Sequence, residues 1–291
     1  MNKVTKAVIP AAGLGTRLLP ATKAIPKEML PIINIPTLQY IVQEAADAGI
    51  KELLIVISRG KEAIKNHFAP AAKLEAELLA KKKLALLEEV RKSNKIVKIK
   101  YVYQAKQLGL GHAIGCAKDF AKGQPIAVLL GDDVVVSKGK TALGQCIDAY
   151  NKTKCSIVGV QPVETKVINK YGIVSPVKKA DAKKDVFAIK NLVEKPEPEE
   201  APSNLAILGR YVLTPDIFNA IAKTAKDKSG EIQITNALKF LAKKNKVCAC
   251  KFSGTRYDLG NKVGMVKATI DFALRDNEIK EDILKFIRSK K

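Results

Sequence analysis

The chain of 291 residues contains no tryptophan, two histidines and only 5% aromatic residues. So few aromatic side chains leave little surface on which nucleic-acid bases could stack. No apolar run approaches the roughly 20 residues that span a bilayer. The N-terminal apolar stretch is too short for a signal peptide and leads directly into a glycine loop. We therefore expect a cytoplasmic protein without a membrane partner.

Cysteines and acidic residues are also few. The five cysteines form no CxxC pair, so we expect reduced thiols and no cysteine metal site. Basic residues outnumber acidic ones by 51 to 29, which gives a net charge of +22. A basic nucleic-acid-binding module without catalysis is therefore one alternative. The lysines are spread along the whole chain, so we expect no nucleic-acid partner. The basic surface would instead attract small polyanionic substrates.

Apolar runs of strand length alternate with helical patterns, which predicts an α/β fold with a mixed, mainly parallel central sheet flanked by helices. The expected strands cover residues 6–10, 53–57, 96–103, 126–130, 156–160 and 205–213. Helices are expected over 37–48, over the charged stretch 73–92, and as two terminal helices within 262–288. We interpret 1–291 as a single domain with a helical insertion around 70–95. Recurrent prolines exclude one helix over 18–36 and predict a mostly extended segment.

A glycine loop, Ala11–Arg17 (AAGLGTR), follows the first expected strand. It is not the dinucleotide-binding fingerprint, because Leu18 replaces the third glycine, and it is not a P-loop, because Thr16-Arg17 follows Gly15. Glycines at 13 and 15 nevertheless let backbone amides approach an anion closely. Arg17 offers a planar fork for phosphate oxygens, and Lys27 on the following arm adds a point charge. The loop therefore predicts phosphate binding.

Eight blocks of the sequence resemble, in order, those of the sugar-nucleotide pyrophosphorylases, and most closely those of the bacterial uridylyltransferase branch. They are GLGTRLLPATKAIPKEMLP (13–31), QLGLGHAI (107–114), LLGDD (129–133), KYGIV (170–174), LVEKP (192–196), SNLAILGRYVL (203–213), GEIQIT (230–235) and YDLGNKVG (257–264). The resemblance implies a Rossmann-like nucleotidyltransferase fold. It also implies transfer of a uridylyl group from UTP to glucose 1-phosphate, giving UDP-glucose and pyrophosphate, with Mg²⁺ and in a dimer or tetramer. LLGDD departs from the LPDD common in that branch and keeps a thymidylyltransferase as an alternative.

The resemblance also implies roles for individual residues. The residues with catalytic roles are Arg17 and Lys27 on the phosphates of UTP, Lys195 on the sugar phosphate, and Asp132 on the metal together with Asp258. The expected nucleotide-binding residues are Ala11, Ala12, Gly13, Gly15, Gln104 and Gly109. The expected sugar-binding residues are Gly172, Glu194, Asn204 and Gly209.

Elementary chemistry supports several of these assignments. A hard cation needs a carboxylate ligand, and Asp132 follows an apolar strand at the sheet edge where ligands bind. We expect the side chain of the neighbouring Asp133 to point elsewhere. The amide of Gln104 can both donate to and accept from uracil. A phosphate monoester with a second pKa of about 6 is already ionised at pH 7, so the nucleophile needs no general base. Glu28 and His112 lie near these motifs, and structural roles are as well supported for them as functional ones.

Overall fold

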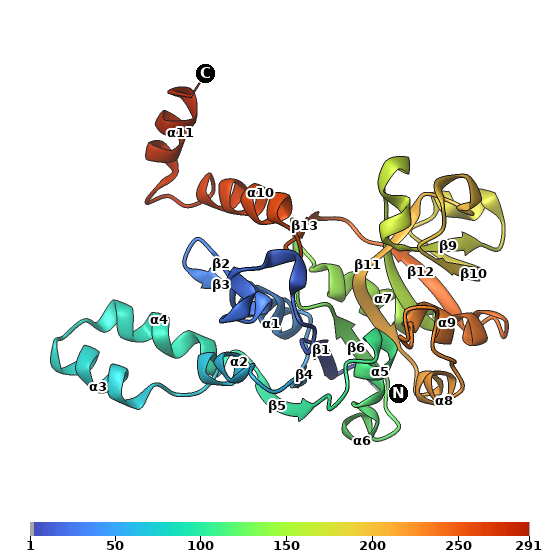
Figure 1. Cartoon of the computed structure of the whole chain (residues 1–291), viewed down its shortest axis with the longest axis horizontal. Helices are drawn as coiled ribbons and strands as arrows, with labels where there is room; N and C mark the ends of the chain where they lie inside the picture. Colours follow the sequence, from blue (N-terminus) through green and yellow to red (C-terminus); the bar gives the residue numbers. More distant parts are fainter. Residues whose placement is uncertain (1–2, 291) are drawn as a thin grey trace.

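The computed structural model describes residues 3–290, and its centre is a mixed nine-stranded sheet (Figure 1). The strands of this sheet, in spatial order, are β5 (Lys98–Tyr103), β4 (Glu52–Ile57), β1 (Lys6–Pro10), β6 (Ile126–Leu129), β11 (Leu205–Leu213), β8 (Ser156–Pro162), β12 (Val247–Lys251), β10 (Val186–Glu194) and β9 (Gly172–Pro176). The first four strands run parallel, whereas β11 is antiparallel to both of its main neighbours, β6 and β8. The predicted α/β fold with a mixed sheet is confirmed, but the sheet is not mainly parallel, because β11 and β10 are antiparallel to their neighbours.

Helices cover both faces of the sheet. They are α1 (Thr37–Asp47), α2 (Glu62–His67), α3 (Ala72–Ala80), α4 (Leu84–Lys95), α5 (Gly109–Gly115), α6 (Lys118–Ala121), α7 (Ala142–Thr153), α8 (Asp216–Ala222), α9 (Ile234–Ala242), α10 (Lys262–Ala273) and α11 (Lys280–Arg288). Alternate residues of β1 enter different cores, because Val8 packs with the core that includes α5, α8 and α9, and Ala7 and Ile9 pack with α1 and α7. This burial on both faces explains the nearly continuous apolar strand sequences.

The charged stretch 73–92, for which we expected a single helix, is instead the helix pair α3 and α4. Lys82 has a φ of 55°, in the left-handed region that ends a helix. Three successive lysines, 81–83, lie at this break. The reversal lets Arg91 Nε donate to Glu75 Oε2 at 2.8 Å, a pair that one straight helix would separate. Figure 1 shows the pair as an arm that reaches away from the sheet.

The segment 18–36 is not one helix, as predicted, but it is less extended than expected. After the 3-10 turn η1 (Thr16–Leu18), it forms two further 3-10 turns, η2 (Ala21–Lys23) and η3 (Lys27–Met29), and then the short hairpin β2 (Pro31–Ile32) and β3 (Ile35–Pro36). A second ribbon, β7 (Asp133–Val136) with β13 (Thr255–Asp258), was not predicted. It brings Asp258 opposite Asp133. Within residues 3–290, no helix is long and apolar enough to cross a membrane.

Candidate active site

The glycine loop and the LLGDD segment meet at one edge of the sheet. Both β1 and β6 end there, and a Cβ added to Gly131 would lie 3.3 Å from the carbonyl oxygen of Pro10. Lys27 lies on η3, in the segment after the loop, and its Nζ donates to Asp132 Oδ2 at 2.6 Å, although the two residues are 105 positions apart in the sequence. The structure therefore brings together two of the predicted residues at the carboxyl ends of parallel strands, the usual ligand edge of such sheets.

The charges at this edge stabilise one another. Burial opposes ionisation of Asp132, but Lys27, Arg256 and Arg17 outweigh it and lower the pKa of this carboxyl. Burial also disfavours the charged form of Lys27, yet the carboxylates of Asp132 and Glu28 raise the pKa of its ammonium group. Both partners are therefore charged at neutral pH. Arg17 lies exposed on η1, where a ligand could reach it.

Asp132 and Asp258 border one small space. A Cβ placed on Gly260 would lie 2.9 Å from Asp132 Oδ2 and 3.1 Å from Asp258 Oδ1. Backbone bonds fix both residues, because Leu259 N donates to Asp132 O at 2.8 Å and Gly260 N donates to Asp258 Oδ1 at 3.0 Å. No group of three or more metal-ligating side chains occurs among the described residues. Two carboxylates with substrate phosphates are nevertheless the set that Mg²⁺ commonly uses, so these residues fit that ion.

The carboxylate of Asp133 contacts a partner of its own, Arg256. Its Oδ1 lies 2.5 Å from Arg256 Nη2, an ion-pair contact without an aligned hydrogen bond. Burial raises the pKa of Asp133 to about 6, with further contributions from Asp132 and Asp258, although Arg256 opposes the shift. Arg256 also lies 3.8 Å from Asp258 Oδ2. Arg256 was not predicted from the sequence, because only the pairing of β13 with β7 places it here.

Glu194, Lys195 and Gly172 cluster at the ends of β9 and β10. A Cβ on Gly172 would lie 3.2 Å from Glu194 Oε2, which accepts a hydrogen bond from Thr235 Oγ1 at 2.6 Å. Lys195 is half-exposed, and its Nζ lies 3.9 Å from Glu194 Oε1. Its φ of 45° is unusual for a residue with a Cβ, and a bond from its backbone N to Tyr171 O supports the turn. Thr235 was missed as a site residue, although it ends the GEIQIT block.

The two other predicted sugar-binding residues lie on β11 and just before it. Asn204 is exposed, and its carbonyl oxygen accepts from Val163 N at 3.0 Å. Gly209 has a φ of 64°, and a Cβ there would lie only 2.5 Å from Asp133 Oδ2. The need for glycine at 209 is therefore explained by the Asp133 side chain. A sugar contact at either position stays a prediction.

The predicted base-binding residues lie around the ends of β1 and β5. Gln104 is buried directly after β5, and its Nε2 lies 2.8 Å from His112 Nδ1. Ala12 accepts at its carbonyl oxygen from Gln107 Nε2 at 3.2 Å. A cavity of about 830 Å³ opens beside them. Its lining residues are Ser58, Arg59, Glu62, Tyr103, Gln104, Ala105 and Gln107.

Ala11 and Ala12 are buried at this end, and Gly13 is exposed. Glycine at 109 has a packing reason, because a Cβ there would lie 2.8 Å from Glu231 Cβ. Glycine at 15 allows Thr22 to pack closely, at 3.2 Å from an added Cβ. Contacts of these residues with a nucleotide stay predictions.

Glu28 has a structural partner. It is fully buried and accepts from Lys61 Nζ at 2.9 Å. Burial raises the pKa of Glu28, while Lys61 and Lys27 oppose that shift. A Cβ on Gly131 would lie 3.2 Å from Glu28 Cγ, so the residue packs beneath the Asp132 turn. His112 likewise contacts Gln104 and so supports a predicted base-reading side chain.

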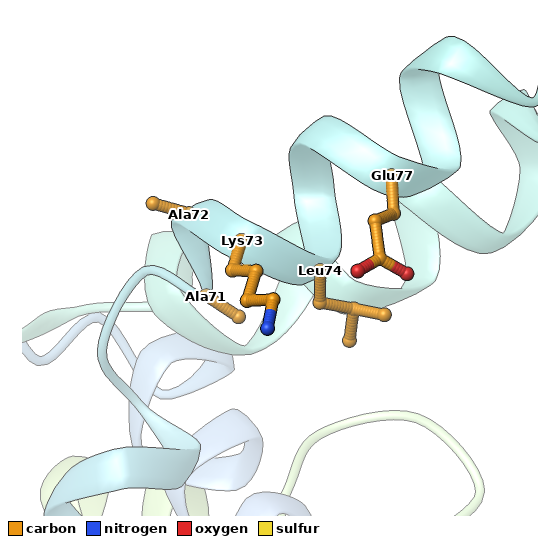
Figure 2. A pocket seen from close by; sticks show the side chains of 5 residues that line it. All are labelled: Ala71, Ala72, Lys73, Leu74 and Glu77. Carbon is orange, nitrogen blue, oxygen red and sulfur yellow. The ribbon is translucent and has the colours of Figure 1, made fainter.

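A hollow of about 420 Å³ lies on the helical arm instead of at the sheet edge. In Figure 2, Lys73, Leu74 and Glu77 extend from one side of α3, with Ala71 and Ala72 at its start. One lysine and one carboxylate beside exposed apolar side chains provide no constellation for phosphate chemistry. The sheet edge is therefore the candidate active site.

A glycine loop at a strand end, with cations beside paired carboxylates on a mixed α/β sheet, is suited to an enzyme that acts on nucleotides. The chain belongs to the nucleotidyl transferase family, whose model matches residues 6–273. It is 50% identical to UTP–glucose-1-phosphate uridylyltransferase 2 of Staphylococcus saprophyticus, an alignment that covers 100% of this chain and 99% of that protein. The resemblance predicted from the sequence is confirmed.

Solved structures agree with this assignment. A UTP-bound UGPase from Acinetobacter baumannii is similar with a TM-score of 0.91 and 36% identity, covering 99% of this chain and all of that one. A UDP-glucose pyrophosphorylase complexed with UDP-glucose gives a TM-score of 0.84 and 39% identity, covering 94% of this chain and 100% of that one. The predicted Rossmann-like nucleotidyltransferase fold is thereby confirmed.

Proposed function

We propose that this chain transfers the uridylyl group of UTP to glucose 1-phosphate, forming UDP-glucose and pyrophosphate. The names of its full-length relatives and the ligands of the similar structures support this reaction. The observation that carries the proposal is the contact between Lys27 and Asp132. This contact joins the segment that follows the glycine loop to the carboxylates at one sheet edge, where the charge of a nucleoside triphosphate can be neutralised.

The chemistry needs positioning more than proton transfer. A phosphate oxygen of glucose 1-phosphate attacks the α-phosphorus of UTP in line, the bond from that phosphorus to the bridging oxygen breaks, and pyrophosphate leaves with the electron pair. The attacking oxygen is already ionised, since the second pKa of a phosphate monoester is about 6. Arg17 and Lys27 bind the triphosphate, and Lys195 binds the phosphate of the sugar. Catalysis then consists of alignment and charge neutralisation.

The metal in this proposal is Mg²⁺, which Asp132 and Asp258 would bind. When bound, it supplies positive charge that offsets the negative charge developing on the phosphates. The space at Gly260, bordered by an oxygen of each carboxylate, supports this assignment. Lys27 pairs with Asp132 in this structure and lies beside the same space, so it can serve either the carboxylate or a phosphate oxygen.

The remaining roles divide between the two ends of the site. Glu194 accepts from sugar hydroxyl groups, with Gly172 offering its backbone and Asn204 and Gly209 in the same segment. The backbone of Ala11–Gly13, together with Gln104 and Gly109, reads the uracil ring, and Gly15 lets the loop approach the phosphates. The contact between Gln104 and His112 supports the base assignment, because it fixes the orientation of the amide.

We also propose a homo-oligomer, a dimer or a tetramer. Large apolar side chains are exposed along α10, with Val263 at 63% and Val266 at 58%, and Phe286 is exposed on α11. Figure 1 shows α11 projecting away from the sheet. Light scattering during gel filtration tests the proposal: a mass of two or four chains is expected, which Val266→Lys should lower. A monomeric wild-type protein would contradict it.

A two-way assay tests the activity. Purified protein with Mg²⁺ is offered UTP or dTTP against several sugar 1-phosphates, and pyrophosphate release is measured. The proposal expects the highest kcat/KM with UTP and glucose 1-phosphate. A preference for dTTP would support the thymidylyltransferase alternative, and no turnover with any pair would refute both. Salt-dependent gel shifts with DNA or RNA in the inactive case would support a nucleic-acid-binding module.

A further inference from the structure

A buried ion pair lies behind the metal carboxylates. Glu44 of α1 and Arg210 of β11 are 166 residues apart in sequence and almost entirely removed from solvent, with Arg210 at 0% exposure. Arg210 Nε donates to Glu44 Oε1 at 2.9 Å, and Arg210 Nη2 donates to Glu44 Oε2 at 2.6 Å. This bidentate geometry fixes the guanidinium in one orientation.

A buried ion pair is a weak source of stability. Replacing a buried ion pair by apolar residues of similar volume is often neutral or stabilising, because desolvation offsets much of the attraction. The remaining donors of Arg210 contact the active-site backbone instead. Its Nη1 donates to Gly209 O at 3.1 Å, and its Nη2 also donates to Asp133 O at 2.7 Å.

The turn that carries Asp132 is held by the bond from Leu259 N to Asp132 O and by the bond from Arg210 Nη2 to Asp133 O. Its own backbone bond, from Asp133 N to Leu130 O, is long at 3.5 Å. Gly209 O accepts from both Leu130 N and Arg210 Nη1, so the end of β6 and the guanidinium share one acceptor. The side chain of Asp133 faces Arg256 on β13. Arg210 therefore fixes the peptide group next to Asp132 from behind.

Glu44 connects the same unit to a third element. Its Oε1 accepts from Leu143 N at 3.0 Å, near the start of α7, in addition to the bond from Arg210. Both polar side chains are thus satisfied entirely within the protein, and neither touches the open site. Their action on a substrate or metal can only be indirect.

We propose that Glu44 and Arg210 are a positioning pair that holds residues 130–133 so that the Asp132 carboxylate faces Asp258. The inference rests on the proposed function, because it assigns the pair to the metal site of that reaction. Without the fork of Arg210, the Asp133 carbonyl loses its buried donor and the turn can rotate. The two carboxylates then meet the metal in a looser arrangement. Supporting residues of this kind typically change metal affinity or activity by about 10- to 100-fold.

Two variants and one control test the pair. Arg210→Lys keeps the charge but loses the fork, and the double variant Glu44→Leu/Arg210→Met replaces the pair by apolar side chains of comparable size. Ile41→Ala, three residues before Glu44 on α1 and fully buried, opens a cavity in the same core but removes no hydrogen bond of the turn. For each folded variant we measure the Mn²⁺ dissociation constant by electron paramagnetic resonance, the melting temperature, and kcat and KM with Mg²⁺.

We expect Mn²⁺ binding about 10-fold weaker and kcat about 10-fold lower in Arg210→Lys and in the double variant, with KM for glucose 1-phosphate within about 2-fold. Ile41→Ala should lower the melting temperature yet bind Mn²⁺ like the wild type. Wild-type Mn²⁺ affinity and kcat in a folded Arg210 variant would overturn the inference, as would an equal loss of Mn²⁺ binding in Ile41→Ala. If the double variant does not fold, Arg210→Lys decides. A wild-type protein that binds no Mn²⁺ would instead refute the metal site of the proposed function.

Discussion

Gly260→Ala is the substitution that the geometry of the metal site defines most sharply. The added methyl group would lie 2.9 Å from Asp132 Oδ2 and 3.1 Å from Asp258 Oδ1, inside the ordinary contact distance of 3.4 Å or more. Each carboxylate must therefore withdraw by a few tenths of an ångström. Because both are flexible side-chain ends, folding should be little affected. The methyl group nevertheless occupies the space in which we propose the metal lies.

The expected magnitude follows from the distances that Mg²⁺ requires. Mg²⁺ needs oxygen ligands at about 2.1 Å in nearly ideal octahedral geometry, and it adapts poorly to displaced ligands. A misplacement of reacting groups on the ångström scale can lower a rate about 100-fold, which corresponds to ~2.7 kcal/mol in the activation free energy. We expect kcat of Gly260→Ala to fall by about that factor, with a higher Mg²⁺ requirement.

Steady-state kinetics over a Mg²⁺ titration, with a melting curve for each protein, measure this effect. Gly115→Ala is the matched control, because its added methyl group would meet only Ile221 Cγ2 at an ordinary 3.5 Å on the side of α5. The control should retain wild-type kinetics and Mg²⁺ dependence. Wild-type kcat and Mg²⁺ dependence in folded Gly260→Ala would refute the proposed metal position.

Further predictions concern the charges and the sugar end. Asp132→Asn should lower kcat by at least about 100-fold, on the scale of lost charge stabilisation, and near-normal turnover would contradict the metal assignment. Lys195→Ala should raise KM for glucose 1-phosphate far more than KM for UTP, and equal changes in both would argue against its sugar-phosphate role. Thr235→Val should raise KM for the sugar because Glu194 loses a donor; an unchanged KM would remove that link. Hydrogen bonds from Ser229 and Gln233 lower the pKa of Asp227 to about 2 from 3.8, so its stabilising effect is present above pH 3.8 and lost as the pH falls through 2. Asp227→Asn should accordingly melt at a lower temperature than wild type at pH 6, with the difference shrinking towards pH 2; a pH-independent difference would contradict this origin.

The sequence predicted the part of the site that depends on local pattern. The apolar run before Gly131-Asp132 predicts a buried strand, and the two glycines after Pro10 predict a loop at the same sheet edge. Parallel-sheet geometry therefore places the glycine loop and Asp132 at one edge, where Lys27 and Asp132 are in contact. Proline spacing also excludes a helix after the loop, although it does not distinguish an extended chain from successive 3-10 turns.

What the sequence could not predict depends on pairing over long separations. The ribbon of β7 and β13 joins segments about 120 residues apart and is too short to show a clear strand pattern, so Arg256 had no visible partner. Glu44 reads as a polar position on an amphipathic helix, and Arg210 interrupts an apolar strand. Glu44 and Arg210 form a hydrogen-bonded ion pair only because α1 packs against the sheet. The break at Lys82 was missed because lysine has good helix propensity, which tertiary contacts overrode.

The most direct test of the central claim follows the α-phosphorus of UTP. The protein is incubated with glucose 1-phosphate, Mg²⁺ and UTP labelled at the α- or the γ-phosphorus, and the products are separated. Attack at the α-phosphorus predicts that the α-label appears in UDP-glucose and the γ-label in pyrophosphate. Recovery of the γ-label in a sugar phosphate, or of all label in unreacted UTP, would contradict the account.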